Sequence, residues 1–113
     1  MGEKDKCEKQ RAREKNAHNN YKEAQATLRK ENAEAIRLCD RADEMCDPEK
    51  FEGKTGERLK RTIARCRSAV ESCTFQEDKV TQASSNFDFY KGEFHESQDA
   101  LSKCEHKKKG GKK

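Results

Sequence analysis

Six cysteines lie symmetrically about one point of this 113-residue chain. They are Cys7, Cys39, Cys46, Cys66, Cys73 and Cys104. The residue numbers add up to 111 for the outermost pair and to 112 for each of the other two pairs, so all pairs are centred near residue 56. A chain that folds back near this point would bring the members of each pair together. The symmetry predicts an all-α fold, a long antiparallel two-helix coiled-coil hairpin stapled by three disulfides.

The predicted disulfides are Cys7–Cys104, Cys39–Cys73 and Cys46–Cys66. Helix geometry supports this pairing, because two cysteines that are seven positions apart lie on one face of a helix. A link between Cys39 and Cys46 is excluded, since a heptad of helix rises by roughly 10 Å, beyond the reach of a disulfide. The alternative is reduced thiols that act as small core residues. Six cysteines in so short a chain favour disulfides and an oxidising compartment.

The composition is too polar for an ordinary globular core. Charged residues make up 42% of the chain and apolar residues only 30%, and the net charge is +4. Such a composition is typical of a disordered chain or of a long, thin helical structure with a narrow buried seam. The heptad periodicity of the apolar residues favours the helical structure.

The first predicted helix covers residues 4 to 46, a segment without proline or glycine. One seam position recurs every seven residues at Cys7, Glu14, Tyr21, Leu28, Ala35 and Ala42. The alternate seam position holds Ala17, Ala24, Leu38 and Met45. Because alanine is small, this seam buries little area and cannot stabilise the first helix alone.

The second predicted helix covers residues 57 to 104 and follows a turn at residues 47 to 56, which contains Pro48, Gly53 and Gly56. Its seam position is occupied without a break by Leu59, Cys66, Cys73, Val80, Phe87, Phe94 and Leu101. We expect one domain at residues 1 to 106 and a disordered, lysine-rich tail at residues 107 to 113.

The sequence contains no arrangement that predicts catalysis. His18, His95 and His106 are its only histidines, and the carboxylates are spread over faces that we expect to be solvated. A zinc site that combines Cys7, Cys104 and His106 is conceivable, but a disulfide with solvated histidines is the favoured interpretation. We therefore expect a protein that is not an enzyme and has no cofactor and no metal.

Three apolar residues lie outside the predicted seam. Phe75 and Phe89 each follow a seam position by two residues, and Ile36 is expected level with residue 76, near Phe75. Apolar side chains on an otherwise polar surface are typical of a binding site for a protein partner or for self-association, although scattered surface hydrophobes are also normal. Phe75, Phe89 and Ile36 are the predicted partner-binding residues.

The chain ends in a cluster of lysines, namely Lys107, Lys108, Lys109, Lys112 and Lys113. Such a cluster can meet an anionic membrane surface. Nucleic-acid binding is unlikely on this pattern, because no aromatic residues accompany the lysines. A solubilising tail is the favoured interpretation.

The twin cysteine pairs resemble those of the coiled-coil-helix-coiled-coil-helix family, the twin CxnC helical hairpins of the mitochondrial intermembrane space. The matching residues are Cys39, Cys46, Cys66 and Cys73, which would join two antiparallel helices. Six residues lie between the two cysteines of each helix, fewer than is usual in the family. The resemblance implies a non-enzymatic assembly factor or accessory subunit. It leaves two oxidising compartments open, the extracellular space and the intermembrane space.

The charged heptads around Tyr21 and the stretch VTQASSNFDFY also resemble the long helices of F-BAR membrane-bending domains. Two functions are therefore expected. The first is a structural or protein-binding module, a disulfide-stapled helical rod that presents a surface to a protein partner. The alternative is a helical protein that binds a membrane surface or another anionic surface through its basic faces and tail.

Overall fold

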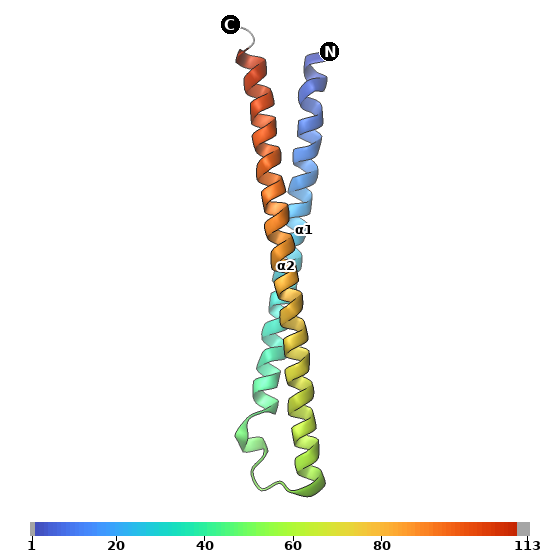
Figure 1. The fold of residues 1–113 in the computed structure, drawn as a ribbon, viewed down its shortest axis with the longest axis vertical. Helices are drawn as coiled ribbons and strands as arrows, with labels where there is room; N and C mark the ends of the chain where they lie inside the picture. Colours follow the sequence, from blue (N-terminus) through green and yellow to red (C-terminus); the bar gives the residue numbers. More distant parts are fainter. Residues whose placement is uncertain (1, 111–113) are drawn as a thin grey trace. The chain divides into compact units, whose positions relative to one another are not determined.

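The computed structural model describes the backbone of residues 2–110 and the side chains of residues 7–106. Helix α1 spans Gly2–Met45, a short 3-10 helix, η1, spans Pro48–Lys50, and helix α2 spans Gly56–Gly110. Figure 1 shows the chain reversing at the green segment between α1 and α2. The described residues contain no β-strand, and the predicted all-α, two-helix hairpin is confirmed.

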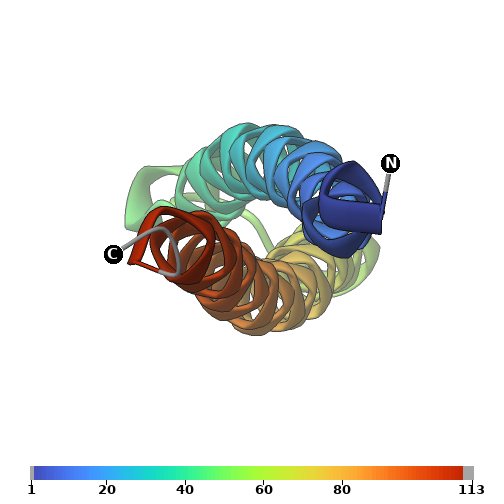
Figure 2. The same ribbon diagram turned by 90° about the horizontal axis from the view of Figure 1, so that it is seen from above.

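The chain divides into two compact units, each of which contains a part of both helices. The terminal unit comprises Met1–Thr27 and Ser84–Lys113, and the turn unit comprises Leu28–Ala83. In the terminal unit, the blue beginning of α1 and the red end of α2 run along each other in Figure 1, and the Cys7–Cys104 disulfide joins them. Figure 2 views the same helices end-on. The two helices run antiparallel in each unit, because early residues of α1 face late residues of α2.

The reversal follows from the residues between the helices. The backbone of Asp47, which precedes Pro48, adopts an extended conformation, because a residue before proline is disfavoured in the helical region. The Asp47 carboxylate accepts a 3.0 Å hydrogen bond from the N–H group of Glu49 and so caps η1. Gly53 and Gly56 have φ angles of +70° and +57°, which glycine adopts without steric cost.

The end of α2 differs from the expected one. The helix continues past Cys104 through Gly110, so the lysines at positions 107 to 109 belong to its last turns. Their side chains, and residues 111–113 altogether, lie outside the described part of the chain. The expected disorder of residues 107–113 therefore stays a prediction for residues 111–113.

Three disulfides join the expected pairs of cysteines, and no cysteine is left free. In the terminal unit, Cys7 is bonded to Cys104 with a Cα–Cα distance of 5.9 Å. In the turn unit, Cys39–Cys73 and Cys46–Cys66 both have a Cα–Cα distance of 4.7 Å. The disulfides are compatible with an oxidising compartment.

Among residues 7–106, the buried apolar side chains are all small. They are Cys7, Ala17, Ala24, Ala35, Ala42, Ala69 and Ala83. The turn unit adds the buried Gln76, whose amide donates a 3.0 Å hydrogen bond across the helix pair to the carbonyl oxygen of Glu31. This bond gives a buried polar group a partner and fixes the level of α2 against α1 in this unit.

The terminal unit also contains an aromatic stack between its two helices. The ring of Tyr21 lies 5.3 Å from that of Phe87 and 5.5 Å from that of Phe94, measured between ring centroids. The ring of His18 stacks on Phe94 at 4.8 Å. These rings bury more apolar area than alanine does, so the two units are stabilised in different ways.

Neither described helix has a segment that is long and apolar enough to cross a membrane.

Candidate functional site

Five large apolar side chains lie on the surface of the described part of the chain. Ile36, Phe75 and Phe89 are 61%, 64% and 61% exposed, and Ile63 and Val70 are also exposed. The fully buried apolar positions are held instead by six alanines and Cys7. The arrangement is the reverse of that in an ordinary globular protein, where side chains of this size are the ones most often buried.

Ile36 lines a groove on one flank of the turn unit. The groove has a volume of about 370 Å³ and is lined by Asn32, Ala35, Ile36, Cys39, Glu77, Val80 and Thr81. Most of its lining is apolar or uncharged, and the Cys39–Cys73 disulfide borders it. We call this surface the apolar groove.

Phe75 belongs to a different flank from Ile36. Glu77 lines the apolar groove, and Phe75 precedes it by two residues, which turns its side chain by about 200° around the axis of α2. Phe75 shares its side of α2 with Ser68 and Ser72, from which it is separated by seven and three residues. The positions of the two residues on their helices thus place Ile36 and Phe75 on different flanks, whereas the sequence predicted that they lie near each other.

The exposed aromatic rings each have a neighbour on their own helix. The ammonium group of Lys79 lies 5.0 Å from the centroid of the Phe75 ring, within the range of a cation–π contact. In the terminal unit, Phe89 meets the edge of Tyr90 at a centroid distance of 5.3 Å. Both rings still expose most of their surface, so neither neighbour accounts for an aromatic residue at that position.

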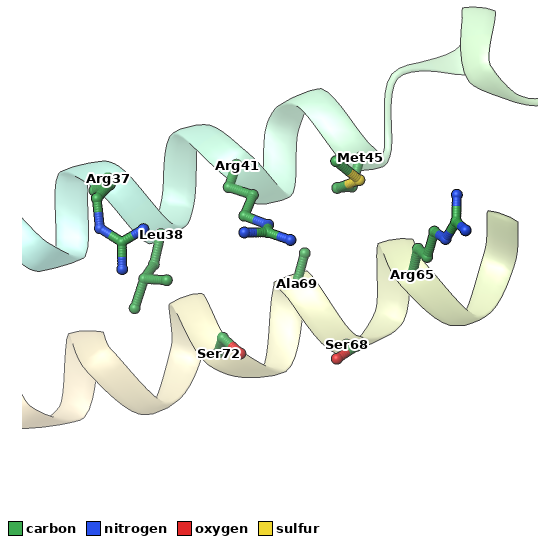
Figure 3. Close-up of a pocket in the computed structure, with 8 residues that line it drawn as sticks. All are labelled: Arg37, Leu38, Arg41, Met45, Arg65, Ser68, Ala69 and Ser72. Atoms are coloured by element: carbon green, nitrogen blue, oxygen red, sulfur yellow. The ribbon is translucent and has the colours of Figure 1, made fainter. Parts of the chain in front are cut away.

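The flank that carries Phe75 contains a second hollow, of about 450 Å³, between α1 and α2 of the turn unit. It is lined by Arg37, Leu38, Arg41, Met45, Arg65, Ser68, Ala69 and Ser72. Figure 3 shows Arg41 reaching from α1 toward Ala69, with Arg37 and Arg65 at opposite ends of the hollow. We call this hollow the cationic pocket. Its lining contains three guanidinium groups, two hydroxyl groups and no carboxylate.

The local sequence explains how the cationic pocket forms. Arg37 and Arg41 are four residues apart on α1, so they lie one above the other on the same face. Opposite them, Ser68, Ala69 and Ser72 are small residues on consecutive turns of α2. Small side chains on one helix that face long ones on the other leave a hollow, and the aliphatic stems of the arginines form its walls.

The three arginines differ in their ion pairs. Arg37 forms a bidentate pair with Glu34, with a Nε–Oε2 distance of 3.2 Å and a second contact from Nη2 to Oε1. This hydrogen bond is the main cause that lowers the pKa of Glu34, and the charge of Lys79 adds to it. Within the described side chains, Arg41 and Arg65 form no ion pair. Two of the three positive charges in the cationic pocket are therefore available to an anion.

One group of potential metal ligands occurs among the described residues, formed by Cys39, Cys73 and Glu77. Their ligand atoms lie within 4.8 Å of one another, but both sulfur atoms belong to a disulfide. Because zinc binds thiolates, this group can hold a metal only after reduction of the disulfide. In the terminal unit, Cys7 and Cys104, which were considered with His106 as zinc ligands, are likewise joined in a disulfide.

The cationic pocket was not foreseen from the sequence, although the chain contains its signal. Residues whose numbers add up to about 112 lie at the same level, and this relation places Arg41 level with the segment of Ser68 to Ser72. The sequence alone therefore indicates a pair of arginines opposite two serines. The relation does not show on which side of the helices these residues meet.

Comparison of the chain with protein-family models, with curated proteins and with solved structures gave no match.

Proposed function

We propose that this chain is a non-enzymatic protein-binding module, a disulfide-linked helical hairpin that presents apolar anchors to a protein partner. The single observation that supports the proposal is the exposure of Phe75, Phe89 and Ile36 in a molecule whose buried apolar side chains are alanines and one cysteine. Large aromatic and aliphatic side chains in a polar surround are typical of interface hot spots.

The distribution of charge favours a protein partner over a membrane surface. Residues 28–83, which form the turn unit, contain 12 Lys and Arg and 12 Asp and Glu, so this unit has no net charge. A membrane-surface binder relies on an excess of basic residues to reach anionic lipids. The membrane-surface function depends mainly on the lysines from residue 107 onward. A negative result in the binding test below would favour this alternative.

The disulfides and the resemblance of the twin cysteine pairs support a place in the extracellular space or in the mitochondrial intermembrane space. In either compartment the six cysteines would stay oxidised. An accessory or assembly role, as the resemblance implies, needs a rigid surface more than a catalytic site. Three crosslinks supply such rigidity in a molecule that has little core.

The proposal predicts that Phe75→Ala combined with Phe89→Ala weakens binding without loss of the fold. Because both rings are more than half exposed, the melting temperature should stay nearly unchanged. Partner binding should lose about 2 kcal/mol or more for each hot-spot ring. The measurement is affinity capture from extracts of cells that express the chain, together with sedimentation of the purified protein to detect self-association.

The matched control is Glu71→Ala combined with Asp88→Ala, which alters exposed residues of the same helix. A partner, or a dimer, that is lost with the phenylalanines and kept in the control supports the proposal. If the phenylalanine variant keeps every interaction of the wild-type chain, the exposed rings are ordinary surface and the protein-binding proposal is wrong.

A further inference from the structure

We propose that the cationic pocket binds a phosphoryl group carried by a segment of the protein partner. The inference adds a ligand chemistry to the proposed protein-binding function and depends on that function for the identity of the partner class. The pocket is formed wholly by residues of the turn unit, and it lies on the flank that also exposes Phe75.

The first argument is the charge of the pocket. Three guanidinium groups, from Arg37, Arg41 and Arg65, line a hollow that has no carboxylate in its lining. Like charges that line one hollow repel one another, and the solvent to which all three arginines are exposed weakens this repulsion. An anion that enters the hollow removes the repulsion, so the pocket is complementary to a group with more than one negative charge.

The second argument is the number of donors. A carboxylate has one charge and two oxygen atoms, and a single bidentate arginine satisfies both. A phosphoryl group on a side chain has a charge of about −1.5 to −2 at neutral pH and three strong acceptor oxygens. Arg41 and Arg65, with the hydroxyl groups of Ser68 and Ser72, supply more donors than a carboxylate accepts. Clusters of arginine are the recurring means by which proteins recognise phosphorylated segments.

The third argument is that the positive charge is local. The turn unit balances 12 basic with 12 acidic residues, so the cationic pocket is an isolated concentration of charge in a neutral unit. A surface of that kind selects one anionic group at one place. An extended polyanion or a lipid surface would instead be attracted by a continuous basic face.

Phe75 extends the pocket in a way that fits a peptide. It follows Ser72 by three residues on the same side of α2, and Lys79 lies over its ring. A segment whose phosphorylated residue enters the cationic pocket would place a neighbouring side chain against this ring. We therefore expect a phosphorylated residue flanked by an apolar one.

Glu34 limits the affinity of the pocket. Its carboxylate holds Arg37 in a bidentate ion pair and neutralises one of the three charges. The variant Glu34→Gln removes that charge and releases the Arg37 guanidinium for the ligand. Phosphoryl binding should then become several-fold tighter, whereas a variant that only damaged the fold would bind more weakly.

The test uses the purified, fully oxidised chain and two degenerate peptide libraries that differ only in a fixed phosphoserine or a fixed serine. Retention on the immobilised protein is compared, and the phosphoserine library should be retained preferentially. The double variant Arg41→Gln, Arg65→Gln should reduce this retention at least about tenfold, since each hydrogen-bonded charge pair contributes on that scale. The variant Glu34→Gln should increase it.

Two controls match these variants in charge. Arg29→Gln with Arg67→Gln removes two exposed arginines of the turn unit that do not line the pocket, and Asp40→Asn removes one exposed carboxylate elsewhere on α1. Both controls should leave retention of the phosphoserine library close to that of the wild-type chain. Far-UV circular dichroism and a thiol count verify that each variant keeps its helices and disulfides.

Several outcomes would overturn the inference. Equal retention of the two libraries would show that the pocket does not recognise a phosphoryl group. Equal losses of retention in the Arg41/Arg65 and Arg29/Arg67 variants would show that the overall positive charge of the unit, and not the pocket, retains the phosphopeptides. Orthophosphate that competes as strongly per molecule as the phosphopeptides would indicate a small-anion site, and stronger, Arg41-dependent binding to phosphatidylserine vesicles would indicate a membrane.

The test also separates this inference from the proposed function. The phosphoserine library is applied to the purified chain, so its result does not depend on the natural partner. If the library fails while the Phe75 and Phe89 variant still loses its partner, the phosphoryl inference is wrong and protein binding stands. If the phosphoserine library binds and the phenylalanine variant keeps every interaction, the phosphoryl inference stands and the proposal that the exposed apolar residues bind the partner is wrong.

Discussion

Reduction of the disulfides is expected to destabilise the turn unit much more than the terminal unit. The turn unit contains two of the three disulfides, and its buried apolar side chains are Ala35, Ala42, Ala69 and Ala83. Each alanine methyl group buries little area, so hydrophobic burial cannot replace the crosslinks. The terminal unit has an aromatic stack between its helices, and we expect this stack to persist when its one disulfide is broken.

The size of the effect follows from the loops that the crosslinks close. A disulfide contributes roughly 2–4 kcal/mol, and more when the loop is longer. Cys46–Cys66 closes a 20-residue separation inside the 34-residue separation of Cys39–Cys73, so the outer crosslink constrains a loop that the inner one has already shortened. The loss on breaking both should therefore be less than the sum of two independent losses.

Hydrogen exchange with and without reductant checks this prediction. Peptides from residues 28–45 and 56–83 should lose protection first, and peptides from residues 10–27 and 84–101 should lose it later. Two paired variants separate the contributions, Cys46→Ala with Cys66→Ala in the turn unit and Cys7→Ala with Cys104→Ala in the terminal unit. Equal loss of protection in both units after reduction would contradict the difference that we infer between their cores.

The spacing of the cysteines was sufficient to predict the hairpin and its crosslinks. In an antiparallel pair of helices with the same rise per residue, residues at one level have numbers with a constant sum, so the level of any residue follows from simple geometry. This reasoning placed Cys39 against Cys73 and Cys46 against Cys66, as the structure has them. It required no knowledge of side-chain packing.

The candidate site was harder to predict, because it depends on rotation about the helix axes. The constant sum places Ile36 level with Phe75 but does not show that the two side chains point to opposite flanks. The cationic pocket also depends on the conformations of its long side chains, such as Arg37, which an ion pair with Glu34 holds in place. Such ion pairs between exposed side chains follow from local rotamers, and a heptad pattern does not specify them.

The stack in the terminal unit was foreseen only in part. Tyr21, Phe87 and Phe94 were assigned to the seam, but His18 was treated as a solvated histidine, and it stacks on Phe94 at 4.8 Å. A histidine ring presents an apolar face that packs on an aromatic ring while its nitrogen atoms stay near water. The heptad pattern places His18 one position after Ala17, beside the seam, where only the structure shows this contact.

Phe94→Ala is expected to be the most destabilising single substitution of an aromatic residue in this protein. The ring contacts both His18 and Tyr21 of α1, so its removal deletes both of these cross-helix contacts and leaves space that alanine cannot fill. Complete removal of a buried phenylalanine costs about 3–5 kcal/mol. Because Phe94 is only partly buried, we expect a loss of about 2 kcal/mol or more in the free energy of unfolding.

Phe89→Ala is the matched control, since it removes the same side chain from the same helix at a position that is 61% exposed. It should change the free energy of unfolding by less than about 0.5 kcal/mol. Thermal unfolding gives both values. Because the Cys7–Cys104 disulfide keeps the helices joined, protection of residues 14–24 against exchange gives the local effect. Equal stability of the two variants would mean that the stack contributes no more than an exposed ring, and the terminal unit would then depend on its disulfide as the turn unit does.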